Sequence, residues 1–297
     1  MTSSSNHPSP RRRQLVALAL LPWLQACSPL RLINASVSSD THTVLLDQAY
    51  GDHARQRADV YLPAPVAVAA APIAVFFYGG SWSSGDRADY RFVGEALASR
   101  GIVTVVADYR LSPEVRYPAF LHDGADAVRW AADHAAAFGA SRERLFVVGH
   151  SAGAYNAAML ALDPRWLARL GLEPRQLAGW AGLAGPYDFL PIGNPDVQVA
   201  FEWPNTPADS QPLFHANAGH ATPRRALLLA ARKDTLVNPQ RNTLAMARVL
   251  EQQGTQVDVE LFDRVSHTTL IGAMARPLRG LAPVLERVSG FLNQPPA

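Results

Sequence analysis

The chain has 297 residues, of which 48% are hydrophobic, and this is enough for one large core or two small ones. Its formal net charge is +2, and three consecutive arginines, residues 11–13, supply that excess. The rest of the chain carries 24 basic and 25 acidic side chains, a net charge of −1. This balance argues against a nucleic-acid-binding protein, which needs a basic face to neutralise phosphates.

The first 27 residues have the pattern of an export signal. The arginines precede a stretch, QLVALALLPWLQA at 14–26, that is apolar but too short to span a bilayer. It ends at Cys27, the only cysteine, and Leu-Gln-Ala-Cys resembles a bacterial lipoprotein signal, in which the cysteine receives lipid. We predict an export signal at 1–26, lipidation at Cys27, a Ser/Thr-rich tether at 27–43, and a periplasmic or membrane-anchored protein. A buried N-terminal helix is the alternative.

From residue 44 to 297 the pattern predicts a single domain. Apolar runs predict strands at 57–62, 73–78, 102–107, 145–148, 177–184, 226–231 and 257–262, and helical spacing predicts helices at 90–100, 123–138, 152–162, 239–253 and 277–292. This alternation predicts an α/β fold whose mainly parallel sheet has helices on both faces. Residues 187–222, rich in Pro, Asn and aromatics and without a clear helix or strand, predict a small cap-like insertion that shapes a substrate pocket.

Residues 149–153, Gly-His-Ser-Ala-Gly, place a serine between two glycines where an apolar strand meets a helix. A G-x-S-x-G turn of this kind exposes the serine Oγ, and the next helix directs its first N–H groups at developing negative charge. A serine attacks only when a base takes its proton and donors stabilise the oxyanion. We predict that Ser151 is a nucleophile. The alternative is an ordinary glycine-rich loop.

A second glycine-containing turn, Tyr-Gly-Gly-Ser-Trp at 78–82, follows an earlier buried strand. It has the chain position from which backbone N–H groups complete an oxyanion hole. We predict oxyanion donors at the N–H groups of Gly80, Ser81 and Ala152, with Gly79 shaping the turn. A simple turn without that role is the alternative.

The base is expected after the last strand, and the acid after an earlier one. Of nine histidines, only His267 follows the strand at 257–262 closely. Asp234, after the strand at 226–231, is the predicted acid, which holds the imidazole tautomer. Asp188 is the weaker candidate, as acid or pocket residue.

The remaining polar and aromatic residues give weaker signals. His215 and His220 lack supporting ligands, so we predict no metal site. Trp82, Trp203 and Phe214 are candidates for lining the substrate pocket, although a single aromatic more often serves packing.

The motifs YGGSW, DYRLSPEVRYPA, GHSAGAYNAA, GLAGPYDF, ARKDTLV and SHTTL together resemble the α/β-hydrolase superfamily over residues 44–293. The resemblance is strongest to bacterial carboxylesterases that include feruloyl/acetyl-xylan-esterase-like and kynurenine-formamidase-like enzymes. It implies an eight-stranded, mostly parallel sheet and acyl transfer by a Ser-Asp-His triad. That family usually has histidine where this chain has Tyr78, which leaves the backbone donors available and puts the loop's supporting hydrogen bonds in question.

Together these features predict a cofactor-independent serine carboxylesterase that acts on small or medium acyl esters through an acyl-enzyme on Ser151. An aryl-formamidase or amidase with the same triad is the near alternative. A hydrolase-like surface protein without catalysis is the alternative from another class.

Overall fold

The structure, a computed structural model, describes Met1 and residues 33–64, 70–220 and 222–295. The predicted export signal, Cys27 and the first part of the predicted tether lie outside the described residues. Within the described ranges, no helix combines the length and the apolar character needed to cross a bilayer.

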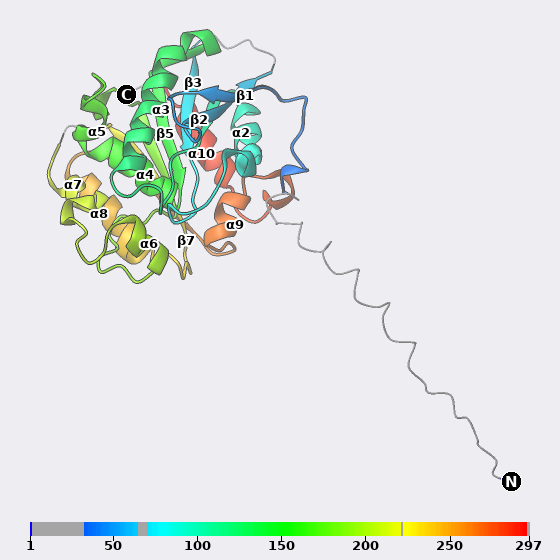
Figure 1. Ribbon diagram of the computed structural model, residues 1–297. Coiled ribbons are helices and arrows are strands. Elements are labelled where there is room, and N and C mark those ends of the chain that lie inside the picture. The colour runs from blue at the N-terminus through cyan, green and yellow to red at the C-terminus, as the bar shows by residue number, and fades with distance from the viewer. Residues whose placement is uncertain (2–32, 65–69, 221, 296–297) are drawn as a thin grey trace.

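One eight-stranded sheet runs through the molecule in the order β1-β2-β4-β3-β5-β6-β7-β8 (Figure 1). The strands are β1 (His42–Ala49), β2 (Arg57–Pro63), β3 (Ala71–Phe77), β4 (Val103–Ala107), β5 (Ala140–His150), β6 (Gly179–Leu183), β7 (Arg225–Ala231) and β8 (Gln256–Phe262). The pairs β1–β2 and β2–β4 are antiparallel, and all the other pairs are parallel. The predicted fold class, a mostly parallel sheet of eight strands, is confirmed.

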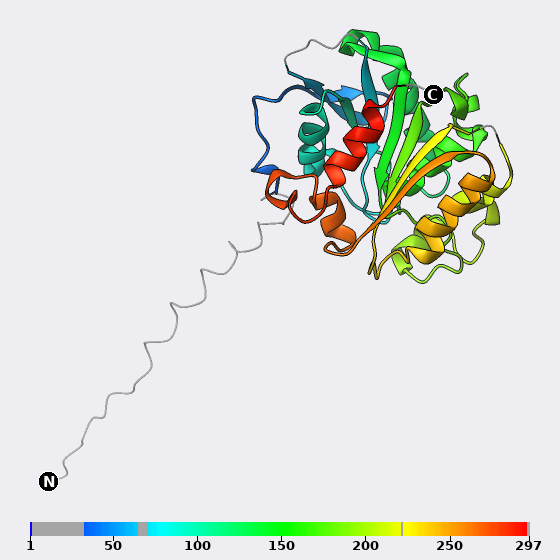
Figure 2. The ribbon, with the colours of Figure 1, turned by 180° about the vertical axis from the view of Figure 1, so that it is seen from behind.

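Helices cover both faces of this sheet. Figure 1 shows α3 (Ala119–His134) and α4 (Ala152–Leu162) in front of it, and Figure 2 shows α2 (Arg91–Ala98) and α10 (Val284–Asn293) on the opposite face. The other α-helices of the described residues are α5 (Pro164–Ala168), α6 (Pro195–Ala200), α7 (Pro212–Asn217), α8 (Ala245–Gln252) and α9 (His267–Gly272). Because both faces are covered, β3, β4, β6 and β7 are buried along their whole length, which explains why their sequences are mostly apolar.

The structure differs from the sequence prediction at the sheet edge and in the insertion. Strand β1 is an additional strand that begins inside the predicted tether, and it was missed because its residues are mostly half-exposed or exposed at the edge. The stretch 187–222, predicted without a helix or strand, contains the short helices α6 and α7. Each has a proline in its first turn, Pro195 and Pro212, where a missing N–H costs nothing.

Candidate active site

Ser151 lies between the end of β5 and the start of α4, in a strained backbone conformation. Its φ is 54° and its ψ is −122°, a combination that costs a non-glycine residue about 1–3 kcal/mol. The flanking glycines are required by close backbone approach. A Cβ on Gly149 would lie 2.1 Å from the carbonyl oxygen of Gly153, and a Cβ on Gly153 would lie 2.0 Å from that of Phe77. The sharp turn that presents Ser151 therefore depends on both glycines.

A continuous hydrogen-bond chain connects Ser151 to His267 and Asp234. The Oγ of Ser151 lies 2.9 Å from Nε2 of His267, and Nδ1 of His267 lies 2.7 Å from Oδ2 of Asp234. A carboxylate accepts, so Nδ1 carries the proton and Nε2 is free to accept from the serine hydroxyl. The structure thus brings together the three residues that the sequence singled out.

The Asp234 carboxylate is held in its charged form. Its Oδ1 accepts hydrogen bonds from the N–H groups of Leu236 at 2.9 Å and Val237 at 3.0 Å. Burial raises the pKa of Asp234, but the hydrogen bonds from His267 and the two backbone N–H groups outweigh burial and lower this pKa below its ordinary value. The carboxylate is therefore ionised at neutral pH and can stabilise a positive charge on the imidazole.

Asp188, the weaker candidate for the acid, lies in a different environment. Its two carboxylate oxygens accept from the Arg241 guanidinium, at 2.9 Å and 3.1 Å. The pair is partly exposed at the base of the insertion. Asp188 therefore joins the loop after β6 to the helical turn Gln240–Leu244 that precedes α8, and Asp234 is the carboxylate that contacts His267.

The loop after β3 approaches Ser151 closely and leaves backbone donors free. A Cβ on Gly79 would lie 2.8 Å from the Cβ of Ser151, so only glycine permits this approach. Across the described residues, no hydrogen-bond partner is found for the N–H groups of Gly80, Ser81 and Ala152. Unpaired donors beside a serine are the geometry that an oxyanion hole requires. The three predicted donors are thus available, and their catalytic role stays a prediction.

The three aromatics predicted for the substrate pocket lie in three different environments. Trp82 is buried in an aromatic cluster, and its Nε1 donates to Asn156 Oδ1 at 3.0 Å. Its ring centroid lies 4.7–6.0 Å from those of Phe120, Tyr155, Phe189 and Phe201. Trp203 lines a hollow of about 580 Å³ beside α6, whereas Phe214 is 51% exposed on α7. The sequence identified the residue type but could not show which way each ring points.

One histidine that the sequence analysis set aside contacts the base. His150 is buried, and its Nε2 lies 3.0 Å from the carbonyl oxygen of His267. Burial, together with repulsion from His267, lowers the pKa of His150 to about 3. Its ring is therefore neutral at pH 7 and can donate to that carbonyl. Its place between Gly149 and Ser151 was the only sequence signal for this contact.

No metal site accompanies this arrangement in the described part of the chain, where no group of three or more His, Cys, Asp or Glu residues could hold a metal ion. His215, one of the two histidines of the insertion, lies with Nε2 2.6 Å from the carbonyl oxygen of Asp209 and 3.4 Å from Asp163. These contacts connect α7 to the loop before α5.

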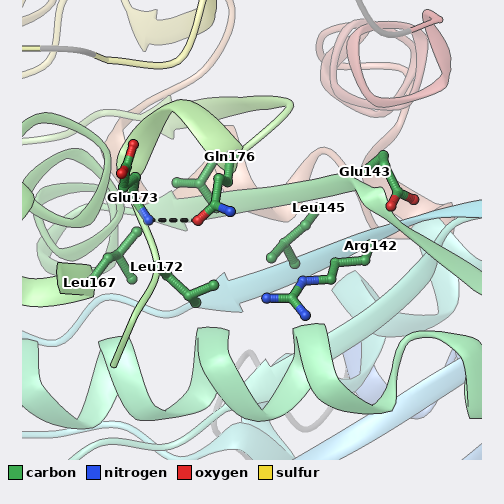
Figure 3. A pocket seen from close by; sticks show the side chains of 8 residues that line it. Arg142, Glu143, Leu145, Leu167, Leu172, Glu173 and Gln176 are labelled. Atoms are coloured by element: carbon green, nitrogen blue, oxygen red, sulfur yellow. Dashed lines mark hydrogen bonds between the residues drawn. The ribbon is translucent and has the colours of Figure 1, made fainter. Parts of the chain in front are cut away.

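A second hollow, of about 260 Å³, lies near the opposite end of β5 (Figure 3). It is lined by Arg142, Glu143 and Leu145 of β5 and by residues between 167 and 177. Figure 3 shows the Arg142 side chain extending into it. Ser151 follows Leu145 by six positions, so the hollow lies about 20 Å along the strand from the serine. It shares no residue with the hydrogen-bond chain.

Comparisons with known proteins agree with this geometry. The family model described as BD-FAE matches residues 58–168, which include both glycine-containing turns. An esterase from Pyrobaculum calidifontis superposes with a TM-score of 0.71 at 22% identity, covering 89% of this chain and 90% of that one. The chain has the α/β-hydrolase fold.

Two curated relatives of this α/β-hydrolase chain are named as esterases. The esterase LipC of Mycobacterium tuberculosis is 32% identical over 152 residues, which are 50% of this chain and 38% of that protein. The probable isoprenylcysteine alpha-carbonyl methylesterase ICMEL1 of Oryza sativa subsp. japonica is 26% identical over 251 residues, 78% of this chain and 58% of that protein. The chain therefore spans less than two thirds of the length of either relative. The predicted resemblance to α/β-hydrolase esterases is confirmed.

Proposed function

We propose that the protein is a serine carboxylesterase that hydrolyses small or medium acyl esters through an acyl-enzyme on Ser151. The observation that carries this proposal is the hydrogen-bond chain from Asp234 through His267 to Ser151, with contacts of 2.7 and 2.9 Å. Free N–H groups stand next to the serine, and the esterases among the relatives give independent support.

In the first half of the reaction, the Ser151 Oγ attacks the ester carbonyl carbon while His267 Nε2 takes the hydroxyl proton. The carbonyl oxygen becomes an oxyanion, and the N–H groups of Gly80, Ser81 and Ala152 can donate to it. One such donor contributes about 2.7–4 kcal/mol to transition-state stabilisation. The Asp234 carboxylate stabilises the imidazolium that forms.

In the second half, the tetrahedral intermediate collapses and the C–O bond to the alcohol breaks. His267 gives its proton to the leaving alkoxide, and an acyl group remains on Ser151. Water then attacks the acyl-enzyme, with His267 again accepting a proton. Collapse of the second intermediate returns the proton to Oγ and releases the carboxylic acid. The cycle uses only protein groups and water.

A series of p-nitrophenyl esters from acetate to octanoate tests this proposal. We expect turnover by the wild-type chain, loss of turnover in Ser151→Ala, and retention in Ser141→Ala, which alters a serine at the opposite end of β5. The chain-length optimum would measure the acyl pocket. Absence of turnover across the series, or equal turnover by Ser151→Ala, would refute the proposal, and turnover of an aryl formamide alone would replace it with a formamidase.

We also propose that the chain is exported and anchored by lipid at Cys27. The arginines at 11–13, the apolar stretch at 14–26 and the Leu-Gln-Ala-Cys sequence support this. In a bacterial host fed radiolabelled palmitate, we expect label in the wild-type chain and none in Cys27→Ser. Label retained by Cys27→Ser, or no label in either chain, would contradict the anchor.

A further inference from the structure

The loop that carries the proposed oxyanion donors has a strained backbone. Gly80 has a φ of 139°, and it is followed by Ser81 at 53° and Trp82 at 57°. Each of the two non-glycine residues costs about 1–3 kcal/mol in this region, and such strain persists only where the surroundings over-determine the conformation. Some contact must therefore hold the segment 79–85, called here the oxyanion loop, in place.

The entry of the oxyanion loop is held by Tyr78, which is completely buried. The Tyr78 hydroxyl donates to Asp108 Oδ1 at 2.6 Å and accepts from Arg55 Nη2 at 2.6 Å. Its ring is stacked between those of Tyr90 and Tyr109, with centroids 5.3 and 5.0 Å away. Burial, together with nearby Tyr109 and Asp108, raises the pKa of Tyr78 well above its ordinary value, so the hydroxyl keeps its proton.

The end of the oxyanion loop is held by Tyr78, Asp108 and Arg55 as well. Arg55 Nη2 also donates to the carbonyl oxygen of Gly85, at 2.9 Å. A Cβ on Gly85 would lie 2.6 Å from Cε2 of Tyr78, so the loop's last residue packs directly on the tyrosine ring. Asp108 accepts from the N–H group of Arg87 at 2.8 Å and from its guanidinium. Both ends of the loop therefore converge on Tyr78, Asp108 and Arg55.

These contacts reach Ser151 through one residue. Gly79 follows Tyr78 directly and approaches the Ser151 Cβ so closely that no side chain fits between them. The carbonyl group of Tyr78 is itself fixed, because it accepts from the Tyr109 hydroxyl at 2.8 Å. A change in the position of Tyr78 would consequently move the N–H groups of Gly80 and Ser81 relative to the serine.

We propose that Tyr78 is a positioning residue, whose hydroxyl, held between Asp108 and Arg55, fixes the oxyanion loop in its strained, donor-presenting conformation. This role rests on the proposed esterase function. Tyr78 thereby supplies the loop's supporting hydrogen bonds at the position where the family that this chain resembles usually has histidine. Without the hydroxyl, one lone pair of a buried carboxylate and one guanidinium N–H lose their partner. The ring contact with Gly85 remains, but the hydrogen-bonded connection between the two ends of the loop through Arg55 is broken.

The test compares Tyr78→Phe with Tyr187→Phe in the full chain. Tyr187 is the matched control, since it is also fully buried and, among the described residues, its hydroxyl has no hydrogen-bond partner. For Tyr78→Phe we expect kcat to fall about 10- to 100-fold with little change in KM, because the loss falls on the transition state. Affinity for a trifluoromethyl ketone, which forms an oxyanion on the serine, should weaken by the same factor. Tyr187→Phe should leave all three quantities unchanged.

A second variant and a second measurement test the same role independently. Arg55→Met keeps the bond from Tyr78 to Asp108 but removes the guanidinium that donates to the Tyr78 hydroxyl and to the carbonyl oxygens of Gly85 and Tyr109. A loss of kcat with the same unchanged KM is expected. Hydrogen exchange in the peptide covering the oxyanion loop should be faster in Tyr78→Phe than in wild type or Tyr187→Phe. This measurement needs no substrate, so it still decides the role of Tyr78 if wild type hydrolyses no ester and the proposed function fails.

Three results would overturn the role of Tyr78. The first is a Tyr78→Phe enzyme with wild-type kcat. The second is a lower melting temperature with unaltered affinity for the ketone, which would show a purely structural residue. The third is unchanged exchange in the loop peptide.

Discussion

The two ends of strand β5 differ, because one end borders a hollow and the other end carries the candidate catalytic serine. Near its start, Arg142 and Leu145 line a hollow of about 260 Å³ whose other walls are leucines and polar surface residues. At its end, Ser151 has a strained backbone, a hydrogen bond to His267 and unpaired N–H groups beside it. Strain and unpaired donors cost free energy, and proteins retain them mostly at functional sites. They therefore indicate the site better than volume does.

The largest effect on activity is expected from breaking the hydrogen-bond chain that reaches Ser151 at the end of β5. In Asp234→Asn the neutral amide can favour the wrong tautomer of His267, so we expect kcat to fall by about 10⁴-fold with the fold intact. The measurement is ester turnover, with circular dichroism to monitor folding. Asp188→Asn, which alters the carboxylate paired with Arg241, is the control and should lose far less. Equal losses in the two variants would contradict the assignment of the acid.

The next effect tests the close packing that makes the turn possible. In Gly153→Ala the new Cβ would lie 2.0 Å from the Phe77 carbonyl oxygen, so β3 and α4 must move apart. We expect a loss of about 1–3 kcal/mol in the free energy of unfolding from overpacking. Activity should drop about 100-fold, because a shift of roughly 1 Å misplaces the reacting groups.

Gly290→Ala is the matched control for this substitution. It lies in α10, and a Cβ there meets nothing within 4 Å. Alanine should leave activity unchanged and raise helix stability by up to about 1 kcal/mol. A Gly153→Ala enzyme with the stability and turnover of Gly290→Ala would refute the packing argument. Urea unfolding and ester turnover on the same samples provide both numbers.

Much of this arrangement could be predicted from the sequence, because the buried strands β3 and β5 are apolar runs and the glycines mark the turns. The meeting of Ser151, His267 and Asp234 followed from the carboxyl ends of parallel strands lying at one edge. The contact of Arg55 with Tyr78 could not be predicted. It depends on which loops the sheet order brings together across 23 positions of sequence.

A smaller, pH-dependent effect concerns His150, the residue directly before Ser151. Burial lowers the pKa of His150 to about 3, whereas an unfolded histidine titrates near 6.5. Below about pH 6.5, His150 therefore binds a proton in the unfolded chain but stays neutral in the folded chain. As the pH is lowered from about 6.5 to about 3, protonation of this histidine in the unfolded chain lowers the free energy of unfolding by about 1.4 kcal/mol per pH unit.

The measurement is the free energy of unfolding in urea at pH 7, 6 and 5 for wild type and His150→Asn. We expect a shallower acid slope in the variant, since asparagine does not titrate. Its stability at pH 7 should be lower, because the ring's contact with the His267 carbonyl is lost. Identical slopes would mean that His150 is protonated in the folded protein.

The smallest effect on activity is expected at the other end of β5. Leu172 lines the hollow there and is 4% exposed, so Leu172→Ala should lower the free energy of unfolding by about 2–3 kcal/mol. The values of kcat and KM should not change, because the hollow lies far from Ser151. If ester turnover fell without unfolding, the hollow would belong to the functional site, and the contrast between the two ends would fail.

The central claim is that Ser151 is an activated nucleophile, and labelling with a fluorophosphonate tests it most directly. Full-chain wild type, Ser151→Ala and Ser141→Ala would each be treated at neutral pH, and the modified peptide would be identified by mass spectrometry. We predict one label per chain on Ser151 in wild type and in Ser141→Ala, and none in Ser151→Ala. An unlabelled wild type, or label that persists in Ser151→Ala, would contradict it.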